Sequence, residues 1–513
     1  MNTNTRIFKK IIYIVIFACF ISAGFICTGN INNNCEVVLA DSNENDQTYT
    51  YFTSRIYSYL TRNSKGQYIR VQGDAYNETV TVYYYDKNFN YIKEKKLKKE
   101  LPLFGAFYET ETNYYILTGQ NNVKQDDKKE VYRITKYDKN FKRISSCGIT
   151  GGKTKAFNPL YPTARITHKG KYLYINTAQR EYADSNGFNH QCSICLRVDT
   201  STMKMEHYEI GFVSHSFDEH ILIDGDKVWT ADINDGSSSI VLNYRTIGEA
   251  ADTFKNRIKL MRADPTMEGM YSIYLGFSLG SFKASETSFL VAGTYDIDYK
   301  NDSGRDVFVA SLNKETNTVN MNYLTSSVEN VDYPTTPHMI EIEQNKFLVL
   351  WSKDNYVYYT CVDGDGDTIT KTYKMKGFLS NCVPIISGNY VTWYSYKDDA
   401  ITFYQINTKK LSETKKTTKT SKVNDATGLK VSKTTKNSVS LSWSKTSRAK
   451  GYIIYRYNNS TGKWDKIGKT SKLKYTDKSL KSKTTYKYKL KAYRVISGKT
   501  QTGKAASITA KTK

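Results

Sequence analysis

The sequence contains few of the short motifs that mark common enzyme active sites. It has no H-E-x-x-H zinc motif, no phosphate-binding P-loop, no Asp-box and no G-x-G-x-x-G at a strand–helix junction. Only 6 His occur among 513 residues, so the commonest general acid–base side chain is scarce. Paired carboxylates for glycoside cleavage are not excluded, because the two residues can come from distant parts of a chain.

Cysteine is also scarce, and its count argues against a disulfide framework. Five cysteines follow Ala40, an odd number for an exported chain. Cys192 and Cys195 have the spacing of a metal or redox pair, but they lie in the strand-like run QCSICLRVD. Residues three apart on a strand point to opposite faces, so one metal would not easily reach both thiols. We therefore predict buried, unpaired cysteines, which suit a reducing or anaerobic habitat, and no metal or cofactor site.

Long apolar runs are missing beyond the N-terminus. Three basic residues precede the uncharged run Ile11–Cys27, and Val38-Leu39-Ala40 fits a cleavage site. The sequence therefore predicts a signal peptide over 1–40 and a secreted or extracellular protein that associates with the cell wall. Because the spacer Thr28–Glu36 is long, an uncleaved membrane anchor is the alternative.

Acidic residues are nearly absent from one part of the chain. The net charge is +24, but Asp425–Lys513 alone holds 23 Lys and Arg against 3 Asp and Glu. Outside residues 408–513 the balance is 45 basic against 46 acidic residues. The C-terminal segment is therefore expected to bind an anionic cell-wall polymer, such as teichoic acid, rather than nucleic acid. A solvated, solubilising surface is the alternative.

Repeated strand patterns are what the sequence has in abundance. It contains 43 Tyr and only 7 Pro, a composition that favours half-buried strands. Tyr85-Asp86-Lys87-Asn88-Phe89 returns as Tyr137-Asp138-Lys139-Asn140-Phe141. Weaker copies of this hairpin occur at Val198-Asp199, Leu242-Asn243, Leu312-Asn313, Val362-Asp363 and Ile406-Asn407. Inner strands are expected before them at Tyr114–Thr118, Tyr172–Asn176, Lys227–Ala231, Phe289–Gly293, Phe347–Trp351 and Tyr390–Tyr394. Seven such units predict an all-β, seven-bladed β-propeller over 48–410.

Three segments are expected to depart from the repeat. Thr48–Leu60 has the pattern of a strand that could pair with the last unit and close the ring. Apolar residues recur at helical spacing from Ile247, which predicts an amphipathic helix over Gly248–Arg262. Leu411–Asn424 is rich in Thr, Lys and Ser without apolar periodicity, which indicates an extended linker.

The segment Asp425–Lys513 resembles a fibronectin type III module over its full length. Ser438–Trp443 matches the second strand with its core Trp, and Gly451–Arg456 matches the third strand. Leu480–Ala492 matches the turn and sixth strand, with Tyr486 at the tyrosine-corner position. The family usually has Pro where Ser482 stands. The resemblance implies a seven-stranded β-sandwich without an active site of its own.

The repeat region more loosely resembles exported Gram-positive proteins that combine a β-propeller with fibronectin type III modules. This likeness depends on Gly187-Phe-Asn-His-Gln191 and Val213-Ser-His-Ser-Phe-Asp218. The resemblance implies no particular activity.

The candidate site residues come from the third and fourth units. His168, His190, His215 and His220 lie there, with Asp218 between the last two. If His190, His215, Asp218 and His220 converged at the centre, they could act as acid, base or metal ligands. The alternative is that they are hydrogen-bonded structural residues near loop ends, and we assign no catalytic residue.

A calcium loop is suggested by Asp363-Gly-Asp-Gly-Asp367, but the sequence does not fit one. Thr368 and Lys374 stand where an EF-hand needs Gly and a bidentate acid. The stretch falls at a hairpin position, so we predict a turn.

Two functions remain open from the sequence. One is an exported, surface-associated binding protein that recognises an extracellular glycan or protein, while its basic module tethers it to an anionic surface. The alternative is an enzyme, a hydrolase, lyase or transferase, that acts on extracellular polysaccharide. Convergence of His190, His215 and Asp218 with an acidic residue on one open face would favour the enzyme.

Overall fold

The computed structural model describes most of the chain after residue 55. The described residues are 56–73, 78–151, 154–157, 164–213, 218–234, 239–250, 257–262, 277–295, 304–326, 334–397, 400–411, 413–416, 425–446, 449–496 and 499–513. The predicted signal peptide and His215 lie outside these ranges.

Every regular element in the described ranges is a β-strand, which confirms the all-β prediction. A search of the same ranges for an apolar helix of membrane-spanning length finds none.

Residues 58–416 form seven antiparallel sheets that follow one another along the chain. We number these sheets 1 to 7; six have four strands, and sheet 3 has five because β9 pairs with β11. Sheets 1 and 2 contain β1 (Ser58–Arg62), β2 (Tyr68–Gln72), β3 (Thr79–Tyr85), β4 (Tyr91–Lys98), β5 (Leu103–Glu109), β6 (Tyr114–Gly119), β7 (Glu130–Tyr137) and β8 (Arg143–Thr150). Sheets 3 and 4 contain β9 (Thr154–Phe157), β10 (Arg165–Lys169), β11 (Tyr172–Glu181), β12 (Gln191–Asp199), β13 (Lys204–His207), β14 (His220–Asp224), β15 (Lys227–Asn234), β16 (Ser239–Thr246) and β17 (Arg257–Arg262).

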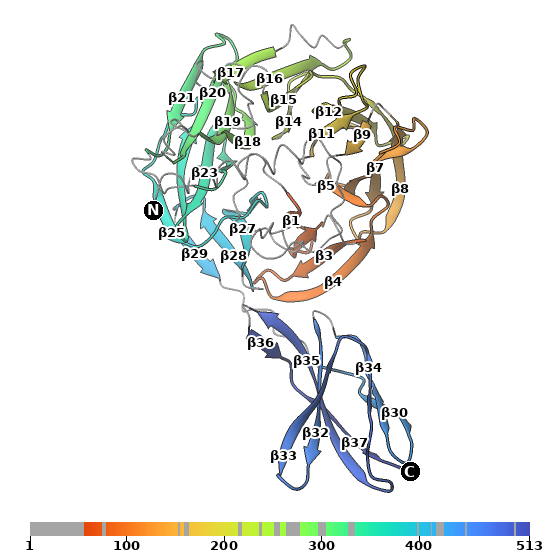
Figure 1. The fold of residues 1–513 in the computed structure, drawn as a ribbon. Coiled ribbons are helices and arrows are strands. Elements are labelled where there is room, and N and C mark those ends of the chain that lie inside the picture. The colour runs from red at the N-terminus through yellow and green to blue at the C-terminus, as the bar shows by residue number, and fades with distance from the viewer. Residues whose placement is uncertain are drawn as a thin grey trace, which may run out of the picture. The chain divides into compact units, whose positions relative to one another are not determined.

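The remaining three sheets repeat the same plan. They contain β18 (Ser278–Ala284), β19 (Ser288–Tyr295), β20 (Asp306–Asn313), β21 (Val319–Tyr323), β22 (His338–Glu343), β23 (Lys346–Lys353), β24 (Tyr356–Asp363), β25 (Tyr373–Lys376), β26 (Ile385–Ser387), β27 (Tyr390–Lys397), β28 (Ala400–Asn407) and β29 (Glu413–Lys416). In Figure 1 the sheets surround a common centre, with fourth strands such as β4, β8 and β21 at the rim. First strands of neighbouring sheets touch, as β10 touches β14 and β14 touches β18.

Burial along the strands follows from this arrangement. The second strand β23 is apolar at consecutive positions because both of its faces are covered by neighbouring sheets. The fourth strand β4, YIKEKKLK, is mostly exposed and rich in lysine. Charged side chains on an edge strand discourage pairing with other chains, so the sequence of β4 suits a rim position.

Apolar clusters join every sheet to the next, and the last sheet to the first. Separate clusters span sheets 1 and 2, 2 and 3, 3 and 4, 4 and 5, 5 and 6, and 6 and 7. A further cluster places Phe89 of sheet 1 against Phe403 of sheet 7, with ring centroids 4.5 Å apart. Arg62 donates to the Ser387 hydroxyl at 2.9 Å across the same contact. The seven sheets therefore pack in a closed cycle.

The structure corrects two predictions in sheet 4. The first is the helix predicted over Gly248–Arg262. Residues 251–256 lie outside the described ranges, but Arg257–Arg262 is strand β17 and pairs with β16, so the helix prediction is wrong there. The apolar spacing was compatible with a helix, but the open edge of β16 supplies backbone partners that favour a strand. The hairpin predicted at Leu242-Asn243 is also wrong, because Asn243 lies within β16 opposite Thr230.

Ring closure and the linker also differ from expectation. The segment Thr48–Leu60 was expected to pair with the last sheet. Its described C-terminal residues begin strand β1, which pairs instead with β2 of sheet 1. Sheet 7 instead completes itself with β29, Glu413–Lys416, which lies inside the predicted linker. An edge strand needs only backbone hydrogen bonds, so its polar sequence did not reveal it.

The C-terminal module, residues 425–513, has two antiparallel sheets around a core of its own. The strands are β30 (Lys430–Thr434), β31 (Val439–Ser442), β32 (Gly451–Asn458), β33 (Lys463–Thr470), β34 (Lys474–Asp477), β35 (Thr485–Ile496), β36 (Lys499–Thr502) and β37 (Ala506–Lys511). Trp443 packs with Tyr452 and Tyr488 between the sheets. The Tyr486 hydroxyl accepts a hydrogen bond from the Lys481 amide at 2.9 Å, which is the bond expected of a tyrosine corner.

Candidate functional site

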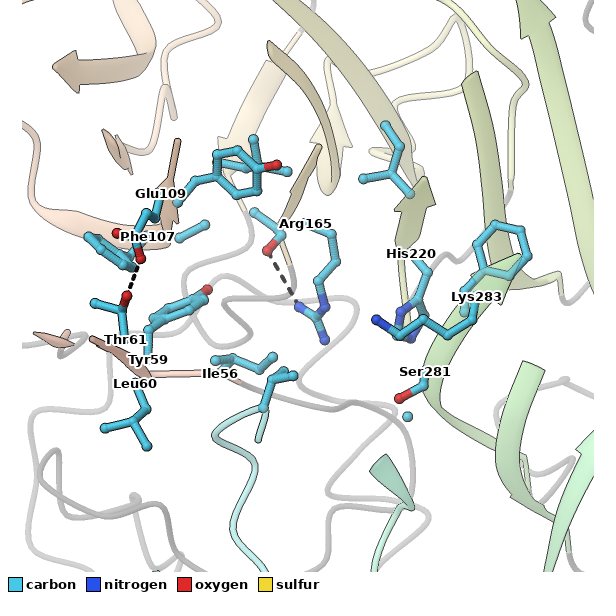
Figure 2. A pocket seen from close by; sticks show the side chains of 18 residues that line it. Ile56, Tyr59, Leu60, Thr61, Phe107, Glu109, Arg165, His220, Ser281 and Lys283 are labelled. Atoms are coloured by element: carbon cyan, nitrogen blue, oxygen red, sulfur yellow. Dashed lines mark hydrogen bonds between the residues drawn. The ribbon is translucent and has the colours of Figure 1, made fainter. Parts of the chain in front are cut away.

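A cavity of about 390 Å³ lies where the first strands of sheets 1 to 5 approach one another. Side chains from β1, β5, β10, β14 and β18 line it, so no single stretch of sequence contains the site. Figure 2 shows His220 and Lys283 on one side, Tyr59, Thr61 and Glu109 on the other, and Arg165 between them. Central cavities between first strands are common ligand sites because the surrounding sheets hold their walls rigidly.

Two basic side chains from different sheets give the cavity its charge. Arg165 is the first residue of β10, and Lys283 lies near the end of β18. Burial lowers the pKa of the Lys283 ammonium, and the nearby Glu341 carboxylate opposes this shift. An anion placed beside Lys283 would lower the cost of keeping the ammonium charged.

The cavity has a single carboxylate among its described lining residues, Glu109. One Glu109 oxygen accepts a hydrogen bond from the Thr61 hydroxyl, and the other accepts one from Lys139 Nζ at 2.7 Å. Because Lys139 compensates this carboxylate, Glu109 does not neutralise Arg165 and Lys283. The described lining of the cavity thus combines two basic side chains, Arg165 and Lys283, with one carboxylate that already contacts Lys139.

The histidine at the cavity is neutral near pH 7. Burial is the main reason that the pKa of His220 falls to about 3, and the Arg165 charge lowers it further. His338, the first residue of β22, is buried in the same way, and its pKa falls to about 4. Neither imidazole adds charge at neutral pH.

Backbone contacts show what His220 and Asp218 do in the fold. His220 Nε2 donates to the Leu279 carbonyl oxygen at 3.3 Å, and the Asp218 carboxylate accepts from the Leu279 amide at 2.9 Å. Both residues therefore hold sheet 4 to the first strand of sheet 5. His338 Nε2 donates to the Ser380 carbonyl oxygen at 2.7 Å and joins sheets 6 and 7 in the same way.

The other predicted histidines lie apart from these contacts. His190 is exposed after the turn between β11 and β12, where its ring contacts the Asp184 carboxylate at 3.1 Å. His168 lies at the exposed end of β10, where Nδ1 is 2.9 Å from the Tyr108 hydroxyl. Because Asp218 is buried against β18, the described members of the predicted cluster do not meet on one open face. Their catalytic role stays a prediction.

Two tyrosine hydroxyls complete the chemistry of the cavity wall. Burial raises the pKa of Tyr59 and of Tyr108 to about 12. Both therefore remain protonated at neutral pH and can donate hydrogen bonds to a bound oxygen atom. The Tyr108 hydroxyl also contacts Nδ1 of His168.

Sequence reasoning did not identify Arg165 or Lys283 as site residues. An alignment of the repeats could have identified Arg165. Arg165, His220 and His338 each begin the first strand of their sheet, so aligned repeats would have placed them at equivalent positions. Lys283 lies at the other end of its strand and shares no such register. No spacing rule joins it to Arg165.

Other motifs have structural explanations. Asp363 accepts the amides of Asp365 and Asp367, so the predicted turn is confirmed. Ser278 is the central residue of a G-x-S-x-G sequence, but it lies buried in β18 and bonds to the Thr294 hydroxyl at 2.7 Å.

The cysteines agree with the prediction that they are unpaired and mostly buried. The five described cysteines have free thiols, and four of them are buried. Within the described ranges, no three His, Cys, Asp or Glu side chains are grouped to hold a metal ion.

Comparison with known proteins finds similarity over parts of the chain. No family model matches the chain. A poly(3-hydroxybutyrate) depolymerase from Ralstonia pickettii is 41% identical over 85 residues, which is 17% of this chain and 16% of the depolymerase. The match therefore spans only a small part of the depolymerase's length.

Two solved structures match different shares of the chain. FN3tt is 24% identical, with a TM-score of 0.16, and the match covers 18% of this chain and 94% of FN3tt. The polysaccharide lyase Uly1 is 9% identical, with a TM-score of 0.42, and the match covers 69% of this chain and 90% of the lyase. The C-terminal module itself has the two sheets, core Trp and tyrosine corner described above, and these features make its fold fibronectin type III-like.

Proposed function

We propose that residues 58–416 form a seven-bladed β-propeller that binds an acidic group of an extracellular glycan in its central cavity. The observation that carries this proposal is the approach of Arg165 and Lys283 from sheets 3 and 5. Glu109, the carboxylate of the cavity wall, already contacts Lys139. A carboxylate or sulfate group would complement these two basic side chains, and Tyr59 and Tyr108 could donate hydrogen bonds to its oxygen atoms.

The basic C-terminal module would then serve as the tether. Its charge, 23 Lys and Arg against 3 Asp and Glu, supports attraction to an anionic surface. The predicted signal peptide supports a location outside the cell, where anionic glycans and wall polymers are the available partners. The whole chain is thus a surface-associated binding protein in this proposal.

Binding of a soluble acidic oligosaccharide tests the cavity. Oligogalacturonate titrated into the full chain should release heat, whereas neutral oligogalactose should not. Lys283→Gln should weaken binding by about tenfold, the loss of one charge-assisted contact of about 1.4 kcal/mol. Lys87→Gln, in an exposed turn, provides a matched control that should bind normally. Equal affinity for acidic and neutral sugars, or equal effects of the two substitutions, would contradict the proposal.

A second candidate function, cleavage of an acidic polysaccharide, is favoured by the contact between Tyr108 and His168. A hydroxyl held 2.9 Å from an imidazole nitrogen can pass a proton to or from a bound sugar. Reducing ends should then accumulate when polygalacturonate is incubated with the full chain, and Tyr108→Phe should abolish their formation. Binding without any product supports the binding protein alone.

A further inference from the structure

One face of the C-terminal module combines aromatic rings with lysines. The inner faces of β32 and β35 build the core, with Tyr452, Ile454, Tyr488 and Leu490. Alternate residues therefore point outward, because side chains along a strand alternate between faces. We define the aromatic–lysine face by the outward side chains Tyr455, Tyr457, Trp464, Lys466, Lys469, Lys487, Lys489 and Lys491; Ile453 and Tyr493 lie on the same side but are buried.

The rings and the ammonium groups of this face lie against each other. Lys489 Nζ is 4.1 Å from the centre of the Trp464 ring, and Lys469 Nζ is 4.2 Å from that of Tyr493. Tyr457 and Trp464 are direct cross-strand partners with ring centroids 5.2 Å apart. Such contacts hold the lysines near the sheet instead of letting them extend into solvent.

Among the described residues of the module, no carboxylate forms an ion pair with a lysine of this face. Asp477 is buried and bonds to Arg456 and to the Tyr488 hydroxyl. Asp465 accepts from the Asn458 side chain, and Asp425 accepts from the Lys504 amide. These are the only three acidic residues in 425–513. The positive charge of the face is therefore left for an external partner.

We propose that the aromatic–lysine face binds an acidic polysaccharide. Apolar C–H faces of sugar rings can pack on Trp464, Tyr457 and Tyr455, while carboxylate or sulfate groups meet the adjacent lysines. The face extends over three neighbouring strands, β33, β32 and β35, so an extended sugar chain could contact several of its side chains. This inference names the ligand of the tether in the proposed function and rests on that part of it, but it is independent of the central cavity.

Retention of the full chain on immobilised polygalacturonate tests the proposal. The combined substitutions Lys469→Gln, Lys487→Gln and Lys489→Gln should lower the affinity by about tenfold or more near 150 mM salt. The matched control carries Lys430→Gln, Lys433→Gln and Lys474→Gln, the same charge change at exposed positions of the other sheet. Its retention should change by about twofold or less, the effect of net charge alone. Circular dichroism of each variant verifies that the fold is kept.

Separate outcomes distinguish the possible partners. Trp464→Ala should weaken retention on polygalacturonate, because the ring packs on sugar. Equal losses from both lysine triples would mean non-specific charge and would overturn the proposal. Polyphosphate that competes as well as soluble polygalacturonate, together with normal retention of Trp464→Ala, would indicate a phosphate polymer. Tighter binding of single-stranded DNA would indicate a nucleic-acid surface. Because the cavity is proposed to bind the same sugar acid, each lysine triple and Trp464→Ala are also compared in a Lys283→Gln background, so failure of the cavity and failure of this face give different results.

Discussion

Single buried polar residues hold neighbouring sheets together at the centre. Asp218 and His220 bond to the two backbone groups of one residue, Leu279, in the next sheet. Asn176 makes a similar contact between sheets 3 and 4, where its side-chain amide donates to the His220 carbonyl oxygen at 3.2 Å. A buried backbone amide without a partner is costly, so these contacts are a source of stability and not only of position.

Asp218→Ala should therefore destabilise the fold by about 1–3 kcal/mol, the cost of leaving the Leu279 amide buried and unbonded. Asp226→Ala, at an exposed turn, should change the free energy of unfolding by about 0.5 kcal/mol or less. Urea unfolding followed by tryptophan fluorescence measures both. Equal stability of Asp218→Ala and the original protein would show that the Leu279 contact is replaceable.

The two buried histidines predict a loss of stability in mild acid. His220 and His338 have pKa values of about 3 and about 4 in the folded state, below the usual value for an unfolded chain. The unfolded state therefore binds more protons as the pH falls from about 6.5 toward 4. Each histidine should reduce the free energy of unfolding by about 1.4 kcal/mol per pH unit in that window. His338→Gln should make this slope shallower in urea titrations at several pH values.

Among the structural elements, the turns are the ones that the local sequence determines most directly. Asp86 and Asp138 each accept the amides two and four residues later. Phe89 and Phe141 follow with positive φ values of 64° and 56°, a conformation that is unfavourable for a bulky residue. Burial of each ring between sheets offsets that cost. The almost identical letters of the two copies therefore encode one turn whose aromatic residue also packs the core.

Phe141→Ala should cost about 3–5 kcal/mol, because the ring is buried and stacks on Tyr114 with centroids 4.4 Å apart. Phe188 follows a turn of the same kind at Asp184, but its side chain is exposed. Phe188→Ala should therefore have an effect below about 0.5 kcal/mol. Thermal unfolding of the two variants checks the contrast, and comparable losses would contradict the role given to burial.

Sequence reasoning succeeded where local chemistry decides the structure and failed where distant segments do. The Asp-based turns and the tyrosine corner are short-range patterns, so they were visible. Strand β17 was mistaken for a helix because only the partner strand β16 distinguishes the two. The cavity could not be predicted either, because Arg165 and Lys283 are distant in sequence and belong to sheets 3 and 5.

At the scale of the whole molecule, the contact between sheets 7 and 1 differs from that expected of a ring closed by strand exchange. Each of the two sheets is built from its own consecutive strands. Aromatic packing around Phe403 joins them, with Tyr85 at 5.0 Å and Phe89 at 4.5 Å between ring centroids. No backbone ladder crosses this boundary among the described strands, so its strength depends on side chains.

Phe403→Ala should therefore open the ring at this boundary before the rest unfolds. The substitution removes a fully buried ring and should cost about 3–5 kcal/mol. Because the lost contacts belong to sheets 1 and 7, hydrogen exchange followed by mass spectrometry should accelerate first in β1, β2 and β28. Phe308→Ala removes an equally buried ring between sheets 4 and 5 and serves as the matched control. It should leave the exchange of β1 and β28 slow at early times. Uniform acceleration across all seven sheets in both variants would show instead that the ring unfolds as one cooperative unit and that its closing contact has no special weakness.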